Sequence, residues 1–387
     1  MTNISTEEVV EMIKQGKRVS DIAKQCRVTR QAIYCHINKL KKKNKPKYTY
    51  PRKNYNSIID WKVYNEGLVK RGEILLDFDF FNNWREELRN MNEGKKGRPY
   101  QYPEVFILFL LKLKCIFKID YRTLEGIARR FIVFIVSAGQ APDYTTLQIR
   151  LKNSKYELDV YSVKKGQELA GDSSGLKTSN RGEYRMNKYR GEKKKYVKLH
   201  IAVDIKTGEV VGFSLTPEET RDHKELPNLI SQAKKRGKIT RILLDRGYDN
   251  QYTYKDLIGE GIKPIIKPKK SMGLEKVRDA LKGIELKKET GEVNIGRYKR
   301  LITLKEYLQD KEGWKERNGY GQRWKVEVRY SVFKRIFGEH IFSKVLGNMK
   351  KEAILKVNLM NLFGSLTRDA FMKGEVSPYK EKRLVSA

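Results

Sequence analysis

The alternation of apolar and polar residues divides the chain into a helical first part and a mixed second part. Near the N-terminus, Ile33, Ile37 and Leu40 recur at helical spacing and share one face. Farther on, the apolar runs 106–117 and 131–136 are most simply buried helices. We therefore expect all-α structure up to about residue 160.

From about residue 165 the spacing changes to that of a β-sheet. Apolar residues occupy every second position over 197–205, and Thr207-Gly208 then offers a turn into a further strand. The pattern predicts strands at 168–172, 197–205, 209–217, 241–245 and 263–268, and helices at 223–236 and 251–259. Residues 272–319 are polar and weakly patterned, and helices resume at about 319–338 and 351–366. This order is typical of an α/β fold.

The first forty residues predict three short helices joined by a tight turn at Arg27-Val28. Ser20 and Thr29 can cap the second and third helices. This arrangement fits a helix-turn-helix, whose last helix enters the DNA major groove. The side chains that point away from its apolar face and could reach base edges are Arg30, Gln31, Tyr34 and Asn38. The alternative is an ordinary three-helix unit that does not bind DNA.

The net charge of the chain indicates what kind of partner it binds. The chain has 82 Lys and Arg against 47 Asp and Glu, a formal net charge of +35. So basic a surface indicates an anionic partner, most simply nucleic acid, although a solvated cationic surface is the alternative. Residues 41–55 contain seven Lys or Arg, two prolines and three tyrosines, which predicts an extended basic linker.

Several function classes are excluded by what the sequence lacks. Cys26, Cys35 and Cys115 have no CxxC spacing, which argues against a zinc ribbon or a disulfide framework. There is no GxxxxGK[ST] phosphate loop, so no nucleotide cofactor is expected. The N-terminus resembles no secretory signal, and the longest apolar run is too short and charged to cross a bilayer. We expect a cytoplasmic, nucleoid-associated protein without membrane contact.

Two aspartates stand where predicted strands end. Asp172 follows 168–171 and Asp245 follows 241–244. Residues at strand ends of an α/β sheet face the crevice where ligands bind. Either aspartate alone could simply cap a turn, but two at the ends of strands in one sheet favour a shared site. Their hard oxygen ligands suit Mg²⁺.

A third acid is expected on the helix near the end of the core. Tyr320, Arg323, Glu327 and Lys334 fall within about 60° of arc on one helical face, although mixed charges can also mark a merely solvated face. Glu339 is a rival, but Gly338 is expected to end the helix before it. Glu327 lies inside the helix, which apolar residues could anchor against the core; these are Trp324, Val328, Phe333 and Ile336.

Together these segments resemble a known family. The sequences GDSSGLK, LLDRGYDN and YGQRWKVEVRYSVFK surround the three acids, and the last fits the pattern Tyr-x2-Arg-x3-Glu-x6-Lys. GRPYQYP and PDYTTL lie ahead of them. Over about residues 60–365 the chain resembles the DDE transposases of bacterial and archaeal insertion sequences. The resemblance implies an RNase H-like α/β core, a mixed five-stranded sheet flanked by helices, preceded by all-α DNA-binding regions.

The resemblance also implies a mechanism and partners. Asp172, Asp245 and Glu327 would hold two Mg²⁺ ions, with Mn²⁺ as a substitute, and catalyse hydrolysis at a transposon end followed by transfer of the freed 3′-OH into target DNA. Tyr320 and Arg323 would contact the transposon end. Lys334 would hold a phosphate. The partners would be double-stranded DNA, at the terminal inverted repeats and the target, and further copies of the chain in a homodimer or larger assembly.

Two alternative functions remain at this point. One is a DNA-binding regulator with an inert transposase-like fold, and the other is an endonuclease without strand transfer. The expected domains are a helix-turn-helix at 1–40, a basic linker at 41–58, a helical DNA-binding or accessory region at 59–160, a catalytic domain at 161–371 and a tail at 372–387.

Overall fold

The computed structural model divides the chain into two compact units, Met1–Ile58 and Ile59–Ala387. The residues that the structure describes are 9, 11, 12, 15, 19–26, 28, 29, 31–34, 59–135, 140–161, 166–178, 196–269, 272–288, 293–368 and 370. No helix in these ranges combines the length and the hydropathy needed to span a membrane.

The first unit has a small core of its own around helix α2 (Val19–Gln25). Its buried side chains are Val9, Ile22, Ala23 and Ile33. The Thr29 hydroxyl accepts a hydrogen bond from the Ala32 N–H, as a helix cap does. Gln31 and Tyr34 are exposed, whereas Arg30 and Asn38 lie outside the described residues.

The second unit contains the expected mixed five-stranded sheet. Its strands are β1 (Gln167–Lys177), β2 (Tyr196–Asp204), β3 (Val210–Pro217), β4 (Ile239–Leu244) and β5 (Lys263–Ile266). They lie in the order β3-β2-β1-β4-β5. β2 is antiparallel to β1 and β3, whereas β4 is parallel to β1 and β5. The predicted RNase H-like fold class is confirmed.

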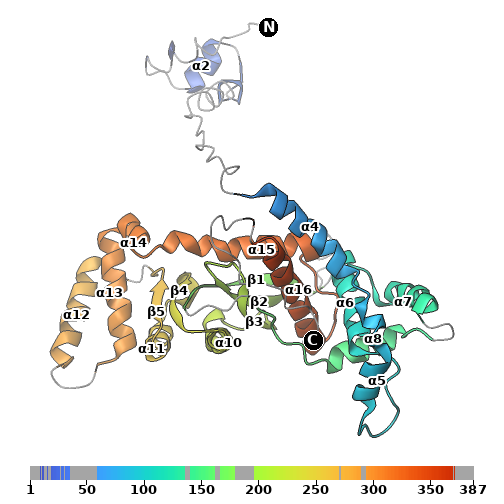
Figure 1. Ribbon diagram of the computed structural model, residues 1–387. Coiled ribbons are helices and arrows are strands. Elements are labelled where there is room, and N and C mark those ends of the chain that lie inside the picture. The colour runs from blue at the N-terminus through green and yellow to red at the C-terminus, as the bar shows by residue number, and fades with distance from the viewer. Residues whose placement is uncertain are drawn as a thin grey trace. The chain divides into compact units, whose positions relative to one another are not determined.

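Helices cover both faces of this sheet (Figure 1). α10 (Asp222–Lys234) and α11 (Gln251–Gly259) lie on one face, and α15 (Trp324–Phe337) and α16 (Leu346–Leu366) on the other. The alternation of β2 explains the two layers: Leu199 and Ile201 belong to the core under α15 and α16, and Ala202 to the core under α10. Alternate residues of β2 therefore pack against helices on opposite faces of the sheet.

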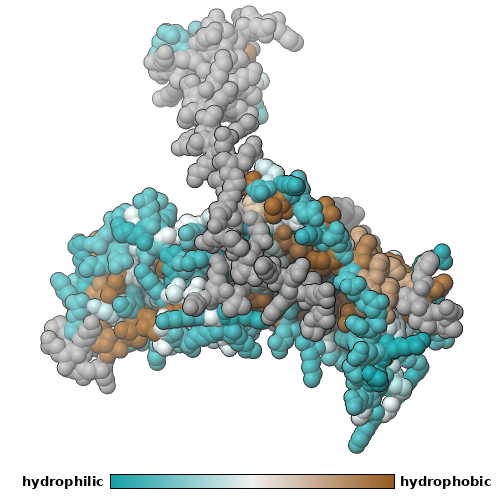
Figure 2. All heavy atoms as spheres, viewed as in Figure 1, coloured by the Kyte–Doolittle hydropathy of each residue, from teal (hydrophilic) through white to brown (hydrophobic). Residues whose placement is uncertain are grey.

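The helical region before the sheet shares the core of the α15 and α16 face. Its elements are α4 (Trp61–Leu75), η2 (Asp79–Phe81), α5 (Trp84–Asn92), α6 (Glu104–Phe117), α7 (Tyr121–Ile135) and α8 (Tyr144–Asn153). Phe80, Phe106 and Phe109 lie in the same apolar cluster as Leu199 of β2. Figure 2 shows apolar residues gathered over α4, which exposes Trp61 and Val69.

Strand β1 is longer than its sequence predicts. It continues five residues past Asp172 to Lys177, through a Ser-Ser-Gly stretch of low strand propensity. The reason is pairing: β1 stays hydrogen-bonded to the apolar strand β2 along this whole length. Asp172 therefore lies within the strand, opposite Ile201, and not at its end.

Residues 272–319 are weakly patterned in sequence, but the structure describes three helices among them. These are α12 (Leu274–Lys288), α13 (Ile295–Gln309) and α14 (Lys311–Arg317). α12 and α13 pack around a narrow core of Val277, Leu281, Leu301 and Leu304. These few apolar residues are enough to hold the two helices together. They recur too rarely in the sequence to give a clear helical period.

Candidate active site

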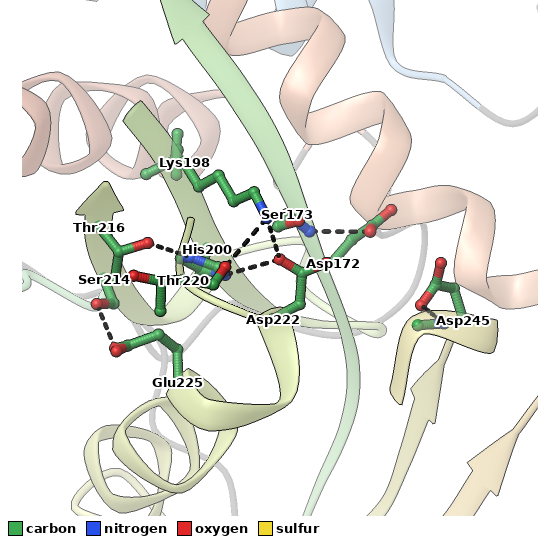
Figure 3. Close-up of polar contacts among 12 residues, drawn as sticks. Asp172, Ser173, Lys198, His200, Ser214, Thr216, Thr220, Asp222, Glu225 and Asp245 are labelled. Atoms are coloured by element: carbon green, nitrogen blue, oxygen red, sulfur yellow. Dashed lines mark hydrogen bonds and ion pairs between the residues drawn. The ribbon is translucent and has the colours of Figure 1, made fainter. Parts of the chain in front are cut away.

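The two aspartates project from neighbouring parallel strands. Asp172 lies on β1, on the face that α15 covers. Asp245 follows β4 and caps the short helix η3 (Arg246–Tyr248), where its Oδ1 accepts a hydrogen bond of 2.7 Å from the Gly247 N–H. Figure 3 shows both carboxylates on the same side of β1.

Helix α15 and the turn before it add the third acid. Arg323 ends the 3-10 turn η4 (Tyr320–Arg323), and its Nη1 donates to Asp172 Oδ2 at 2.9 Å. The second amino group of Arg323 pairs with Glu327, one helical turn later. A single guanidinium thus bridges two of the three predicted acids. Asp245 lies close enough for its negative charge to raise the pKa of Asp172.

The inner face of α15 explains why Glu327 lies at this place. The helix buries Val326, Tyr330, Phe333 and Phe337 against the sheet. The Tyr330 hydroxyl lies 2.7 Å from the carbonyl oxygen of Asp172, which ties the helix to β1 at the site itself. Glu327, one position after Val326, is therefore turned toward solvent.

The expected anchors of this helix were partly wrong. Trp324 is 56% exposed and Val328 is 38% exposed. Phe333 does anchor the helix, and Ile336 is half-buried. Large apolar residues lie on both faces of the helix, so apolar character alone could not show which face is buried. The buried face is the one that carries Tyr330 and Phe333, because it packs against β1 and β2.

Tyr320 takes a structural position in this conformation. Its ring is buried against Trp314, and its hydroxyl donates to the carbonyl oxygen of Leu244 at 3.2 Å, next to Asp245. Burial raises the pKa of Tyr320 to about 12, so the hydroxyl keeps its proton at neutral pH. A contact between Tyr320 and DNA stays a prediction.

Lys334 lies two turns beyond Glu327 and pairs with Glu339. The Lys334 Nζ is 3.6 Å from Glu339 Oε1, and Lys177 of β1 is 3.1 Å from Glu339 Oε2. Gly338, at a φ of 79°, ends α15 and leaves Glu339 outside the helix, as its sequence position indicated. A phosphate contact by Lys334 stays a prediction.

The charges at the site are only partly balanced. Burial raises the pKa of Asp172, and the negative charge of Asp245 raises it further, while the Ser173 N–H and Arg323 act in the opposite direction. A divalent cation between the carboxylates would relieve this repulsion.

The donor set fits a hard divalent cation, because three carboxylates approach from β1, the end of β4 and α15, and the space beside Asp172 and Glu327 already holds a positive group. Within the described ranges, however, no three acidic, histidine or cysteine side chains lie close enough to hold a metal ion. Arg323 lies in that space and pairs with both Asp172 and Glu327.

A second polar group lies on the opposite side of β1 (Figure 3). His200 is buried, with its Nε2 2.8 Å from Thr216 Oγ1, and Lys198 lies 3.4 Å from Asp222. His200 is a sheet-face residue of β2. Asp222 lies in the first turn of α10, after the N-cap Arg221. Because His200 pairs with Ser173 and not with Asp172, this group faces α10 and away from the acids.

Sequence reasoning missed a clamp next to Asp245. Asp249 is buried, accepts a hydrogen bond of 2.7 Å from Arg300 Nε, and also accepts one from the Lys269 N–H. The pair holds α13 against the loop that carries Asp245. The only signal was an aspartate four residues after Asp245, and nothing pointed to Arg300, because its helix was not predicted.

Comparison with known families decides the relationship. A family model described as a transposase DDE domain matches residues 164–362, just over half of the chain, and a second model with the same description matches residues 69–181. The chain belongs to the DDE transposase family. The first match contains Asp172, Asp245 and Glu327, as well as the helices α12 to α14 between the second and third acids.

Solved structures of other transposases also resemble this transposase. A piggyBac transposase synaptic complex with hairpin DNA has 12% identity and a TM-score of 0.31, over 82% of this chain and 83% of that one. The Drosophila P element transposase strand transfer complex has 12% identity and a TM-score of 0.29, over 77% and 87%. A pre-cleavage Mos1 transpososome has 11% identity and a TM-score of 0.24, over 80% and 78%. At this level the family assignment depends on the two family models.

Proposed function

We propose that this transposase binds the ends of a mobile element, cleaves DNA there and joins the freed 3′ ends to target DNA. The observation that carries the proposal is the meeting of Asp172 and Glu327 on Arg323, beside Asp245, in an RNase H-like fold. The three acids come from β1, the end of β4 and α15, so only the folded sheet and helix bring them together.

In this proposal the three acids hold divalent ions, Mg²⁺ or in its place Mn²⁺. Two such ions, when bound, stabilise both the attacking and the leaving oxygen of an in-line displacement. Water first attacks the phosphorus at the transposon end; the new phosphorus–oxygen bond gives a 5′-phosphate, and the broken bond leaves a 3′-OH. That hydroxyl then attacks a target phosphodiester, forms a new phosphorus–oxygen bond and releases the 3′-OH of the target strand.

The surrounding side chains position the DNA. Arg323 exchanges its carboxylate partners for a backbone phosphate when DNA and metal arrive, since a guanidinium binds either anion through the same parallel hydrogen bonds. Lys334 binds a phosphate farther along the strand. Tyr330, bonded to the backbone of Asp172, keeps α15 in register with β1 during this exchange.

Two other functions differ from this one in testable ways. An inert regulator has no need for two acids that meet on one guanidinium with a third nearby, so this placement of Asp172, Glu327 and Asp245 favours an enzyme. An endonuclease would share the site and differ only in lacking strand transfer. Joining two transposon ends also needs two of them held together, and we therefore propose a dimer or larger assembly on DNA.

If the aspartates bind metal and not DNA, their substitution should affect DNA cleavage but not DNA binding. Asp172→Asn and Asp245→Asn should each abolish cleavage of end-bearing DNA in Mg²⁺ while DNA affinity stays close to that of the wild type, because the basic surface is untouched. Gel-shift titration and a nicking assay on the same duplex measure the two properties. Cleavage at the wild-type rate by either variant would show that the site assignment is wrong.

The first forty residues should supply sequence discrimination. A protein that starts near Tyr55 should lose its preference for transposon ends but keep salt-sensitive nonspecific binding, because the base-reading side chains are gone and the remaining unit is still basic. Competition between end-bearing and unrelated duplexes measures the preference. An undiminished preference in the shortened protein would refute the proposed role of Gln31, Tyr34, Arg30 and Asn38.

A further inference from the structure

Lys118 has a backbone conformation that lysine seldom adopts. It follows α6 as the C-cap residue, with a φ of 56° and a ψ of 34°, in the left-handed region. Among the described residues it is the one non-glycine residue with a positive φ. This conformation costs an L-residue about 1–2 kcal/mol, and helices commonly end here on glycine. A lysine at a glycine position suggests a role for its side chain.

The Lys118 side chain reaches the segment that follows α15. A methyl group built on Gly338 would lie 3.9 Å from the Nζ of Lys118. The next residue, Glu339, pairs with Lys177 and with Lys334. Three amines, from the end of α6, from β1 and from α15, therefore meet around Gly338 and Glu339.

The backbone around Glu339 is fixed against β1. The Lys177 N–H donates to the Glu339 carbonyl at 2.7 Å, and the Ile341 N–H donates to the Lys177 carbonyl at 2.9 Å. Just beyond, the buried carboxylate of Glu352 accepts hydrogen bonds from the N–H groups of Phe342 and Ser343. The backbone that carries Glu339 is thus held against β1 by the fold.

The side chains around Glu339 are partly exposed to solvent. The Lys177 and Glu339 side chains are 42% and 47% exposed, and Lys334 is 31% exposed. The ammonium groups of Lys177 and Lys334 pair with the Glu339 carboxylate, and Lys118 adds a third ammonium group beside Gly338. Lys334 lies seven residues from Glu327 along α15, which is about 10 Å, or roughly three base-pair rises of DNA.

We propose that Lys118, Lys177 and Lys334 form a binding site for the backbone phosphates of DNA, in which Glu339 is the internal anion that DNA phosphate replaces. The site binds the strand a few nucleotides from the scissile bond. This inference rests on the proposed function, because it assigns a further part of the same DNA path. The three lysines are named here the lysine clamp.

Lys118→Gly separates the function of the side chain from its structural cost. Glycine relaxes the left-handed backbone, so the melting temperature should stay the same or rise. Affinity for duplex DNA in Mg²⁺-free buffer should fall about 5- to 10-fold near 0.1 M salt. The negative slope of log K against log [KCl] should become less steep by about 0.9, because one phosphate contact is lost. Lys276→Gln, on the exposed surface of α12, removes one charge away from the clamp and is the matched control.

Glu339→Gln should act in the opposite direction. It removes the internal anion and keeps the side-chain shape, so DNA affinity should rise several-fold and the salt slope should steepen. Fluorescence anisotropy with a labelled duplex measures both variants, and competition with inorganic phosphate distinguishes a polymer site from a simple anion site.

Two results would overturn the lysine clamp: equal losses in Lys118→Gly and Lys276→Gln, or weaker binding by Glu339→Gln. Displacement of the duplex by millimolar phosphate would assign the amines to free anions. Failure of the wild-type chain to bind or cleave DNA would instead refute the proposed function, so the two failures are distinguishable.

Discussion

Glu327→Gln is expected to abolish Mg²⁺-dependent nicking of an end-bearing duplex, with a loss of at least about 10³-fold. The amide has the shape of the carboxylate but lacks the charge that a metal ligand contributes. Because Tyr330 and Phe333 pack α15 against the sheet, the amide should stay in the place of the carboxylate. Single-turnover cleavage at saturating DNA measures the effect.

Two other glutamates make this prediction specific. Glu339→Gln should lose far less cleavage activity at saturating DNA. Glu339 lies beyond the end of α15 and pairs with Lys177 and Lys334, away from Arg323. Glu275→Gln, on the exposed surface of α12, is the control for a general charge effect. An active Glu327→Gln beside an inactive Glu339→Gln would reverse the assignment of the third acid.

The largest effect on stability is expected from Glu352→Gln. Glu352 and Lys356 form a buried ion pair of 2.7 Å, with side-chain exposures of 4% and 1%, and the buried Lys114 lies close by. Removing the carboxylate charge leaves two buried ammonium groups without a counterion, which should cost about 3–5 kcal/mol of unfolding free energy. Urea denaturation measures the loss. Glu260→Gln, in the exposed pair with Lys234, should cost no more than about 1 kcal/mol.

The same residue gives a pH dependence of defined sign. Burial by itself would raise the pKa of Glu352, but Lys356 and Lys114 outweigh it and hold the pKa below the ordinary value of 4.5. The carboxylate therefore contributes stability above about pH 4.5, and this contribution disappears as the pH falls through the folded pKa. The stability difference between wild type and Glu352→Gln should shrink over that acidic range. A constant difference from pH 7 to pH 3 would contradict the assignment.

Much of the catalytic core could be predicted from the sequence because local pattern and fold agree there. The strict alternation in β2 predicts a strand with two different faces, and the structure has both. The spacing from Arg323 to Glu327 predicts neighbouring side chains one helical turn apart, and they form an ion pair. Gly338 ends α15 and separates the two glutamates, as its residue type indicated.

The remaining features depend on contacts between distant segments. The extension of β1 to Lys177 is stabilised by pairing with β2, which no local propensity reports. Arg300 reaches Asp249 across 51 residues, from a helix whose apolar stripe is narrow. The contact between Arg323 and Asp172 spans 151 residues, so the guanidinium that lies between Asp172 and Glu327 could be found only in three dimensions.

The helices α12 to α14, placed between Asp245 and Glu327, also order events during synthesis. A ribosome adding about 5–20 residues per second needs roughly 8–30 s to pass from Asp172 to Glu327. All five strands, and then the α12–α13 pair with its own core, are complete before the last acid is made. Under the proposed function, the strands of the sheet are therefore synthesised before Glu327, and a product truncated in α13 would carry Asp172 and Asp245 without the third acid.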